Sequence, residues 1–151
     1  MGRHTYTSLH YHCVFGTLGR RNLIVPALKE RIHGCMGGIV NNLQGLPIRI
    51  GGTRDHVHIL CALRADMSPA EAVQKIKANT TGWIHKTLPS MDDFAWQEGY
   101  GGFTVSRSNI DAVADYIANQ EVHHRTMTFQ EEFLLLLKKH DVQYDPATIW
   151  E

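Results

Sequence analysis

Long apolar segments are missing from this chain, and cysteines are few. None of its 151 residues belongs to a run approaching the roughly 18 apolar residues of a transmembrane helix. The N-terminus also lacks the basic-then-apolar pattern of a signal peptide. We therefore expect a soluble, cytoplasmic protein. Cys13, Cys35 and Cys61 are odd in number, widely spaced and embedded in apolar sequence, so we expect reduced core thiols, without disulfides or a zinc site.

The chain also lacks net charge, which at first sight argues against a nucleic-acid partner. The charges are unevenly distributed, however. Residues 1–86 carry 11 Lys/Arg and 4 Asp/Glu, whereas residues 87–151 carry 4 Lys/Arg and 11 Asp/Glu. This asymmetry permits a basic face suited to a polyanion, but the two halves can equally neutralise each other across the fold. Composition alone leaves both interpretations open.

The pattern of apolar residues predicts one domain, residues 1–151, without linkers or repeats. Period-two alternation and turn residues predict strands at 8–18, 48–53, 56–63 and 101–107. Helical periodicity predicts helices at 26–44, 69–88, 108–123 and 129–140, and the second begins with the capping box Ser68-Pro69-Ala70-Glu71. This order predicts an α+β, ferredoxin-like (RRM-like) antiparallel sheet with helices on one face, plus C-terminal helices that carry Tyr116.

Two histidines are the first candidates for chemistry. His56 and His58 are separated by one residue in a predicted strand, so their side chains share a face and can offer adjacent ligands to a divalent metal. Asp55, just upstream, could accept a hydrogen bond from a ring N–H and fix the tautomer. The pattern is short and the chain has ten histidines, so for this pair taken alone the favoured interpretation is two half-exposed strand histidines without a metal.

A tyrosine and an amide form the second candidate group. Tyr116 and Gln120 are four residues apart in a predicted helix, so the phenol and the amide oxygen can point toward one place. The commoner structure is a tyrosine at the helix boundary with its hydroxyl in solvent.

Together the two groups indicate phosphodiester chemistry. A phenol with a reference pKa of about 10 is a poor nucleophile unless its electrophile is polarised. A metal held by two histidines and an amide oxygen can neutralise charge that develops on a phosphodiester. Attack by Tyr116 would then produce a 5′-phosphotyrosine and a free 3′-OH. A second 3′-OH could attack that linkage and rejoin strands without ATP.

These residues fall in segments that resemble the single-tyrosine HUH transposases of the insertion-sequence 200/605 class. The matching segments, in the family's order, are 11–15 (YHCVF) with the following Arg20 and Arg21, 51–60 (GGTRDHVHIL), 96–106 (WQEGYGGFTVS) and 116–120 (YIANQ). The four segments are distributed along most of the chain, from residue 11 to residue 120, and their joint occurrence is specific although each one alone is not.

The resemblance implies a dimer that moves DNA as a single strand, recognises subterminal hairpins and uses Mg²⁺ or Mn²⁺. It implies that Tyr116 is the nucleophile and that His56, His58 and Gln120 hold the metal. Asn119 is a possible substitute ligand, because related subgroups of the family use Asn near this position, although the four-residue spacing from Tyr116 favours Gln120. In the family the tyrosine helix can belong to one subunit and the histidines to the other. Action on DNA implies association with the nucleoid.

The candidate phosphate contacts are basic residues of the first half: Arg20, Arg21, Arg54, Lys75 and Lys77. A solvated face is an equal alternative for any one of them. Two other functions remain open. One is a domesticated, repeat-associated nickase. The other is a non-catalytic nucleic-acid-binding ferredoxin-like module, which predicts exposed aromatic residues on central strands, where this chain has His56 and His58.

Overall fold

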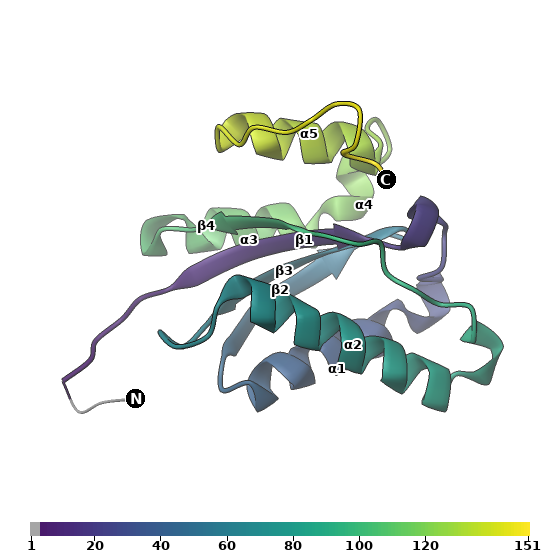
Figure 1. Ribbon diagram of the computed structural model, residues 1–151, viewed down its shortest axis with the longest axis horizontal. Helices are drawn as coiled ribbons and strands as arrows, with labels where there is room; N and C mark the ends of the chain where they lie inside the picture. The colour runs from purple at the N-terminus through teal and green to yellow at the C-terminus, as the bar shows by residue number, and fades with distance from the viewer. Residues whose placement is uncertain (1–3) are drawn as a thin grey trace.

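The sheet has the predicted ferredoxin-like topology. The computed structural model describes residues 4–151. Four strands form one antiparallel sheet in the order β2-β3-β1-β4 (Figure 1). Their bounds are β1 His10–Gly16, β2 Leu46–Gly52, β3 His56–Ala62 and β4 Gly101–Thr104. The two central strands, β1 and β3, are therefore the ones that carry the histidines of the sequence motifs.

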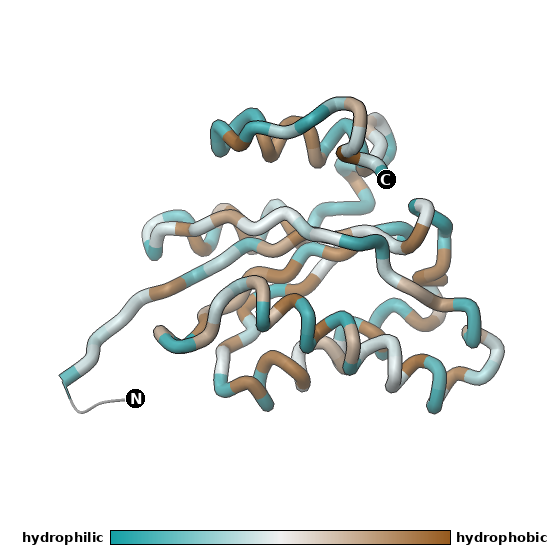
Figure 2. The backbone as a smooth tube through the Cα atoms, in the orientation of Figure 1, coloured by the Kyte–Doolittle hydropathy of each residue, from teal (hydrophilic) through white to brown (hydrophobic). Residues whose placement is uncertain are grey.

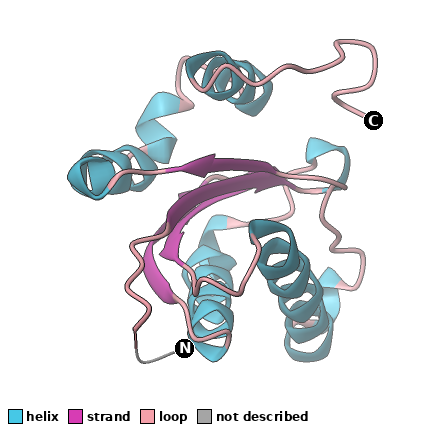
Figure 3. Cartoon of the chain, turned by 60° about the vertical axis from the view of Figure 1, so that its left-hand side comes forward, coloured by secondary structure: helices cyan, strands magenta, loops and turns pink. Residues whose placement is uncertain are grey.

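Helices cover both faces of this sheet. α1 (Pro26–Asn42) and α2 (Pro69–Thr87) lie on one face, and α3 (Ile110–Ala118), α4 (Gln120–His123) and α5 (Phe129–Lys139) lie on the other (Figures 1 and 3). Short 3-10 helices span Leu18–Arg20, Pro89–Met91 and Arg107–Asn109. The predicted capping box starts α2, because Ser68 Oγ accepts a hydrogen bond from the Glu71 amide at 3.1 Å. Within residues 4–151, no helix has both the length and the apolar character needed to cross a membrane.

The tyrosine helix is not continuous as predicted. The expected helix 108–123 is divided into α3 and α4 at Asn119, whose backbone leaves the helical region with φ −103° and ψ 26°. The Asn119 side chain donates a hydrogen bond to the Asp115 carbonyl at 2.8 Å and so closes the last turn of α3. Strand boundaries differ too, because β1 and β4 are shorter than the predicted strands 8–18 and 101–107. β2 begins at Leu46 and includes Pro47, which the sheet tolerates because β2 is an edge strand.

The central strand β3 is buried on both faces. Val57, Ile59 and Cys61 belong to the large core that α1 and α2 cover. The alternate residues His56 and His58 point to the other face and are 0% exposed. Apolar residues recur along the strands and along the flanking helices (Figure 2). All three cysteines are free. Cys13 and Cys61 are buried, as predicted for core thiols, whereas Cys35 is half-buried.

Gly51 of β2 sets how closely α3 approaches the sheet. Gly51 pairs with His58 of β3. A Cβ atom at Gly51 would lie 2.8 Å from Ile117 Cγ2 and closer still to the Ile117 carbonyl oxygen. Because real Cβ atoms do not approach neighbours this closely, only glycine lets α3 rest at its observed distance from β2.

We predict that Gly51→Ala destabilises the fold by about 1–3 kcal/mol, because the added methyl group overpacks the contact between β2 and α3. Gly38→Ala is the matched control, since a Cβ at Gly38 meets nothing within 4 Å and the residue lies inside α1. That variant should gain about 0.5–1 kcal/mol from higher helix propensity. Urea unfolding measures both values. Equal effects of the two substitutions would contradict the close approach.

His33 on α1 makes stability depend on pH. Its Nε2 atom is buried without a hydrogen-bond partner in the described chain. Burial, followed by the positive charge of Lys29, lowers the pKa of His33 from 6.5 to about 4. Between these two values the unfolded chain binds a proton that the folded chain does not.

The free energy of unfolding should therefore fall as the pH drops from 6.5 to 4, and His33→Leu should reduce this slope by at most one proton's contribution. Above pH 6.5, His33 contributes no slope. Urea titrations of both proteins across this window test the prediction, and parallel curves would refute it.

Candidate active site

Each histidine of the pair on β3 lies within hydrogen-bonding distance of a neighbouring side chain through its Nδ1 atom. His56 Nδ1 lies 2.8 Å from Asp55 Oδ1 and 3.1 Å from Thr53 Oγ1. His58 Nδ1 lies 2.7 Å from Nε2 of His12, a buried residue of the neighbouring strand β1. The Nε2 atoms of His56 and His58 face away from these partners, toward Glu132 of α5. Asp55 therefore lies where the sequence predicted, whereas the equivalent contact of His12 was not predicted.

Glu132 lies at the centre of the site and is 1% exposed. Its Oε1 atom lies 3.0 Å from His58 Nε2 and 3.4 Å from His56 Nε2. Its Oε2 atom accepts hydrogen bonds from the Tyr116 hydroxyl and, at 2.9 Å, from Gln120 Nε2. One carboxylate thus contacts Tyr116 and all three residues that the resemblance predicts as metal ligands.

The structure brings Gln120 into the site and leaves Asn119 outside. Gln120 Oε1 lies 2.8 Å from His56 Nε2. Because the Gln120 amide nitrogen donates to Glu132, the oxygen is the atom that faces the histidines. The exposed Asn119 side chain is engaged in capping α3. The geometry therefore favours Gln120 of the two amides.

His124 also belongs to the site. No role in the site was predicted from the sequence for His123 or His124. His124 Nε2 lies 3.1 Å from both Gln120 Oε1 and Glu132 Oε1. After the break at Asn119, α4 leads from the end of α3 toward α5, which carries Glu132 (Figures 1 and 3). His123 stacks on the Tyr116 ring with a centroid distance of 4.7 Å. Both histidines thus contact residues of the site.

Burial and hydrogen bonding shift the pKa values of the central groups. Burial alone would lower the pKa of His56, but hydrogen bonds with Asp55, Glu132 and Gln120 outweigh it and raise the pKa to about 9. Burial lowers the pKa of His58 despite its bond to Glu132. Burial, then the hydrogen bond and charge of Glu132, raise the pKa of Tyr116. The phenol therefore keeps its proton at neutral pH in this arrangement.

The same residues fit a divalent metal. Ligand atoms of His56, His58 and Glu132 all lie within 4.8 Å of one another, and all three residues are buried. Two imidazoles and carboxyl or amide oxygens are a donor set that divalent cations accept. An Nε2 ligand needs its Nδ1–H bonded to an acceptor, and Asp55 and His12 can accept from His56 and His58. This buried His-His-Glu cluster can hold a divalent metal.

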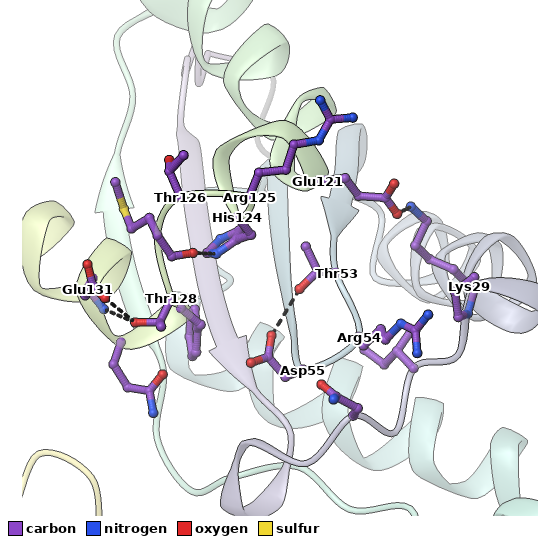
Figure 4. A pocket seen from close by; sticks show the side chains of 16 residues that line it. Lys29, Thr53, Arg54, Asp55, Glu121, His124, Arg125, Thr126, Thr128 and Glu131 are labelled. Carbon is purple, nitrogen blue, oxygen red and sulfur yellow. Dashed lines mark hydrogen bonds and ion pairs between the residues drawn. The ribbon is translucent and has the colours of Figure 1, made fainter.

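Two clefts flank the cluster. The larger, about 730 Å³, is lined by Asp55 and His124, and Lys29, Arg54 and Arg125 surround it (Figure 4). Lys29 is paired with Glu121 at 2.8 Å, whereas no ion pair involves Arg54 or Arg125 among the residues described.

The second cleft lies between α3 and α5 and has a volume of about 520 Å³. Tyr116, His12 and Glu132 line it, together with Lys139 and His140. The cluster therefore has an opening beside Asp55 and another beside Tyr116.

The predicted phosphate contacts are scattered. Arg54 lines the larger cleft. Arg20 lies 5.5 Å above the Trp150 ring, and Arg21 pairs with Asp93 at 2.9 Å. Lys75 and Lys77 belong to α2, on the opposite face of the sheet from the site (Figure 1). Lys77 Nζ donates to the carbonyls of Gln97, at 2.8 Å, and Gly99, so it anchors a loop.

Sequence reasoning missed Glu132, His12 and His124. A signal for Glu132 was present, because it occupies the i+3 position of an apolar helical stripe. That stripe comprises Phe129, Phe133, Leu136 and Leu137. A lone carboxylate on such a stripe needs a buried partner. His12 and His124 offered no comparable local signal.

The fold resembles two solved transposase structures. A Deinococcus radiodurans R1 protein described as a candidate transposase is 21% identical, with a TM-score of 0.60 over 80% of this chain and 96% of that one. A REP-associated tyrosine transposase bound to a REP hairpin is 13% identical, with a TM-score of 0.60 over 82% of this chain and 73% of that one. At these identities the likeness establishes the fold alone. No match was found among curated proteins.

The sequence itself matches a family. The family described as "Transposase IS200 like" matches residues 5–120. This range contains the whole sheet, the histidine pair, Tyr116 and Gln120, and it ends before α5. Because the match spans well over half of the chain, the chain belongs to the family of IS200-like transposases.

Proposed function

We propose that this protein cleaves and rejoins single-stranded DNA through a covalent bond to Tyr116. In this proposal His56, His58 and Gln120 hold Mg²⁺ or Mn²⁺, and Asp55 orients His56. The observation that carries the proposal is the convergence of the Tyr116 hydroxyl and the His58 imidazole on one buried carboxylate. A nucleophile and a candidate metal site are thereby held together, as family membership leads one to expect.

The chemistry follows from the positions of these groups. Tyr116 Oη forms the new bond to phosphorus, the bond from phosphorus to the 3′ oxygen breaks, and the products are a 5′-phosphotyrosine and a 3′-OH. The phenolic proton leaves along its hydrogen bond to Glu132 Oε2, and the departing 3′ oxygen takes a proton from solvent. A bound divalent cation would neutralise charge developing on the phosphate oxygens. Rejoining is the reverse attack by another 3′-OH.

The two clefts suggest how a DNA strand reaches the site. Arg54 and Arg125 beside the larger cleft supply positive charge for phosphates, and the second cleft exposes one side of Tyr116. The REP-associated transposase of similar fold was solved with a hairpin, and we propose that hairpins at element ends are recognised here too. Such an enzyme would act at the nucleoid, as a homodimer.

A non-catalytic module that binds RNA on an open sheet is less well supported. That mode of binding needs exposed aromatic residues on the central strands. Here α3, α4 and α5 cover the sheet face that carries His56 and His58, and both histidines are 0% exposed.

We predict that Tyr116→Phe abolishes the covalent adduct on a single-stranded oligonucleotide that carries the element's end, in the presence of Mg²⁺ or Mn²⁺. The variant should still bind the hairpin, because only the attacking oxygen is removed. Denaturing gels measure the adduct and gel shifts measure the binding. Tyr144→Phe, at a tyrosine that is 45% exposed, is the control and should cleave normally. Cleavage by Tyr116→Phe would mean that another group or water attacks.

A mixing experiment asks whether Tyr116 acts beside the histidines of its own chain. In this structure Tyr116 and His58 of one chain share the Glu132 carboxylate. We therefore expect that mixing Tyr116→Phe with His56→Ala restores no cleavage, because every site lacks one group. Recovery of a substantial fraction of wild-type cleavage would instead show that mixed dimers form composite sites between subunits.

A further inference from the structure

Glu132 is a charged side chain on the buried side of α5. It lies on the buried stripe of α5 with Phe129, Leu136 and Leu137. Placing an unpaired carboxylate on an apolar surface is costly, and a residue with no other purpose would be apolar at this position. Its hydrogen-bond partners lie on β3, α3 and α4 and at His124, which follows α4. α5 therefore contributes a negatively charged side chain to the site. This helix lies outside the family match, which ends at residue 120.

The charge balance of the predicted ligands is the second observation. His56, His58 and Gln120 offer two imidazoles and an amide, and none of these is an anion when bound to a metal. Mg²⁺ and Mn²⁺ prefer oxygen ligands and are usually held by at least one carboxylate. Asp55 cannot serve this purpose from its present position, because it contacts His56 at Nδ1, on the far side of the ring. Glu132 is the carboxylate whose oxygen lies near both Nε2 atoms.

The two oxygens of Glu132 also divide between two sets of partners. Oε1 faces the imidazoles of His56, His58 and His124. Oε2 faces the Tyr116 hydroxyl and the Gln120 amide. A single carboxylate can therefore bind a cation through one oxygen and hold the nucleophile through the other.

From these contacts we infer that Glu132 is a fourth ligand of the metal and the residue that positions Tyr116 and Gln120 against it. The inference rests on the proposed function and extends it, because it makes α5 part of the catalytic unit. The positioning role follows from the hydrogen bonds of Oε2, which orient the Gln120 oxygen toward His56 and keep the phenol beside the cluster.

Manganese binding by the full-length protein tests this inference without DNA. Isothermal titration with MnCl₂ should give a Kd for Glu132→Gln that is at least about tenfold weaker than wild type. Glu131→Gln is the matched control: it removes the same charge from an exposed neighbour on α5 and should leave the Kd unchanged. His56→Ala should abolish binding. Circular dichroism and thermal unfolding establish that each variant is folded.

The outcomes separate the inference from the proposed function. If His56→Ala loses Mn²⁺ but Glu132→Gln binds as tightly as wild type, Glu132 is not a ligand and only the inference fails. If wild type itself binds no Mn²⁺, both fail.

Should Glu132→Gln not fold, wild-type protein labelled with ¹³C at glutamate carboxyls gives the answer. Titration with Mg²⁺ should shift one carboxyl resonance of the wild-type protein. The same resonance should still be present, and shift, in labelled Glu131→Gln. The absence of any shift would overturn the inference.

Discussion

One buried carboxylate organises the face of the sheet on which the candidate active site lies. Glu132 is removed from water, and its charge is tolerated only because imidazole, amide and phenol groups surround it. Those groups come from β3, α3 and α4, elements that lie apart in the sequence. The same contacts that satisfy the carboxylate therefore bring the tyrosine, the glutamine and the histidine pair together. The site is therefore complete only when α5 is docked on this face of the sheet.

This arrangement is possible because the two faces of the sheet carry different side chains. Alternation along β3 sends Val57, Ile59 and Cys61 into the core beneath α1 and α2, and His56 and His58 to the other side. β3 is central and gains rigidity from both neighbouring strands. The absence of a side chain at Gly51 lets α3 lie against the edge strand. A stiff platform thus fixes the histidines while helices bring the other groups to them.

The uneven charge distribution has a structural meaning that composition left open. The basic half contributes the histidine pair and Arg54, which lines the larger cleft. The acidic half contributes Gln120 and Glu132, and its Glu121 pairs with Lys29 across the fold. The halves therefore do neutralise each other in part, yet the acidic half also supplies the carboxylate at the centre of the site. Lys75 and Lys77 lie on the opposite face of the sheet and do not contact the site.

The fold could be predicted from local patterns, since each strand and helix carries its own periodicity and Ser68 carries its own cap. The shared face of His56 and His58 follows from the two-residue period of a strand, so sequence alone determined it. The sequence alone could not reveal the break at Asn119, where the side chain bonds to the Asp115 carbonyl and the helix is interrupted. Nor could it pair His12 with His58 or Glu132 with His58, residues 46 and 74 positions apart. Only the tertiary structure decided those contacts, because strand order and helix packing, which no local period encodes, determine which distant side chains meet.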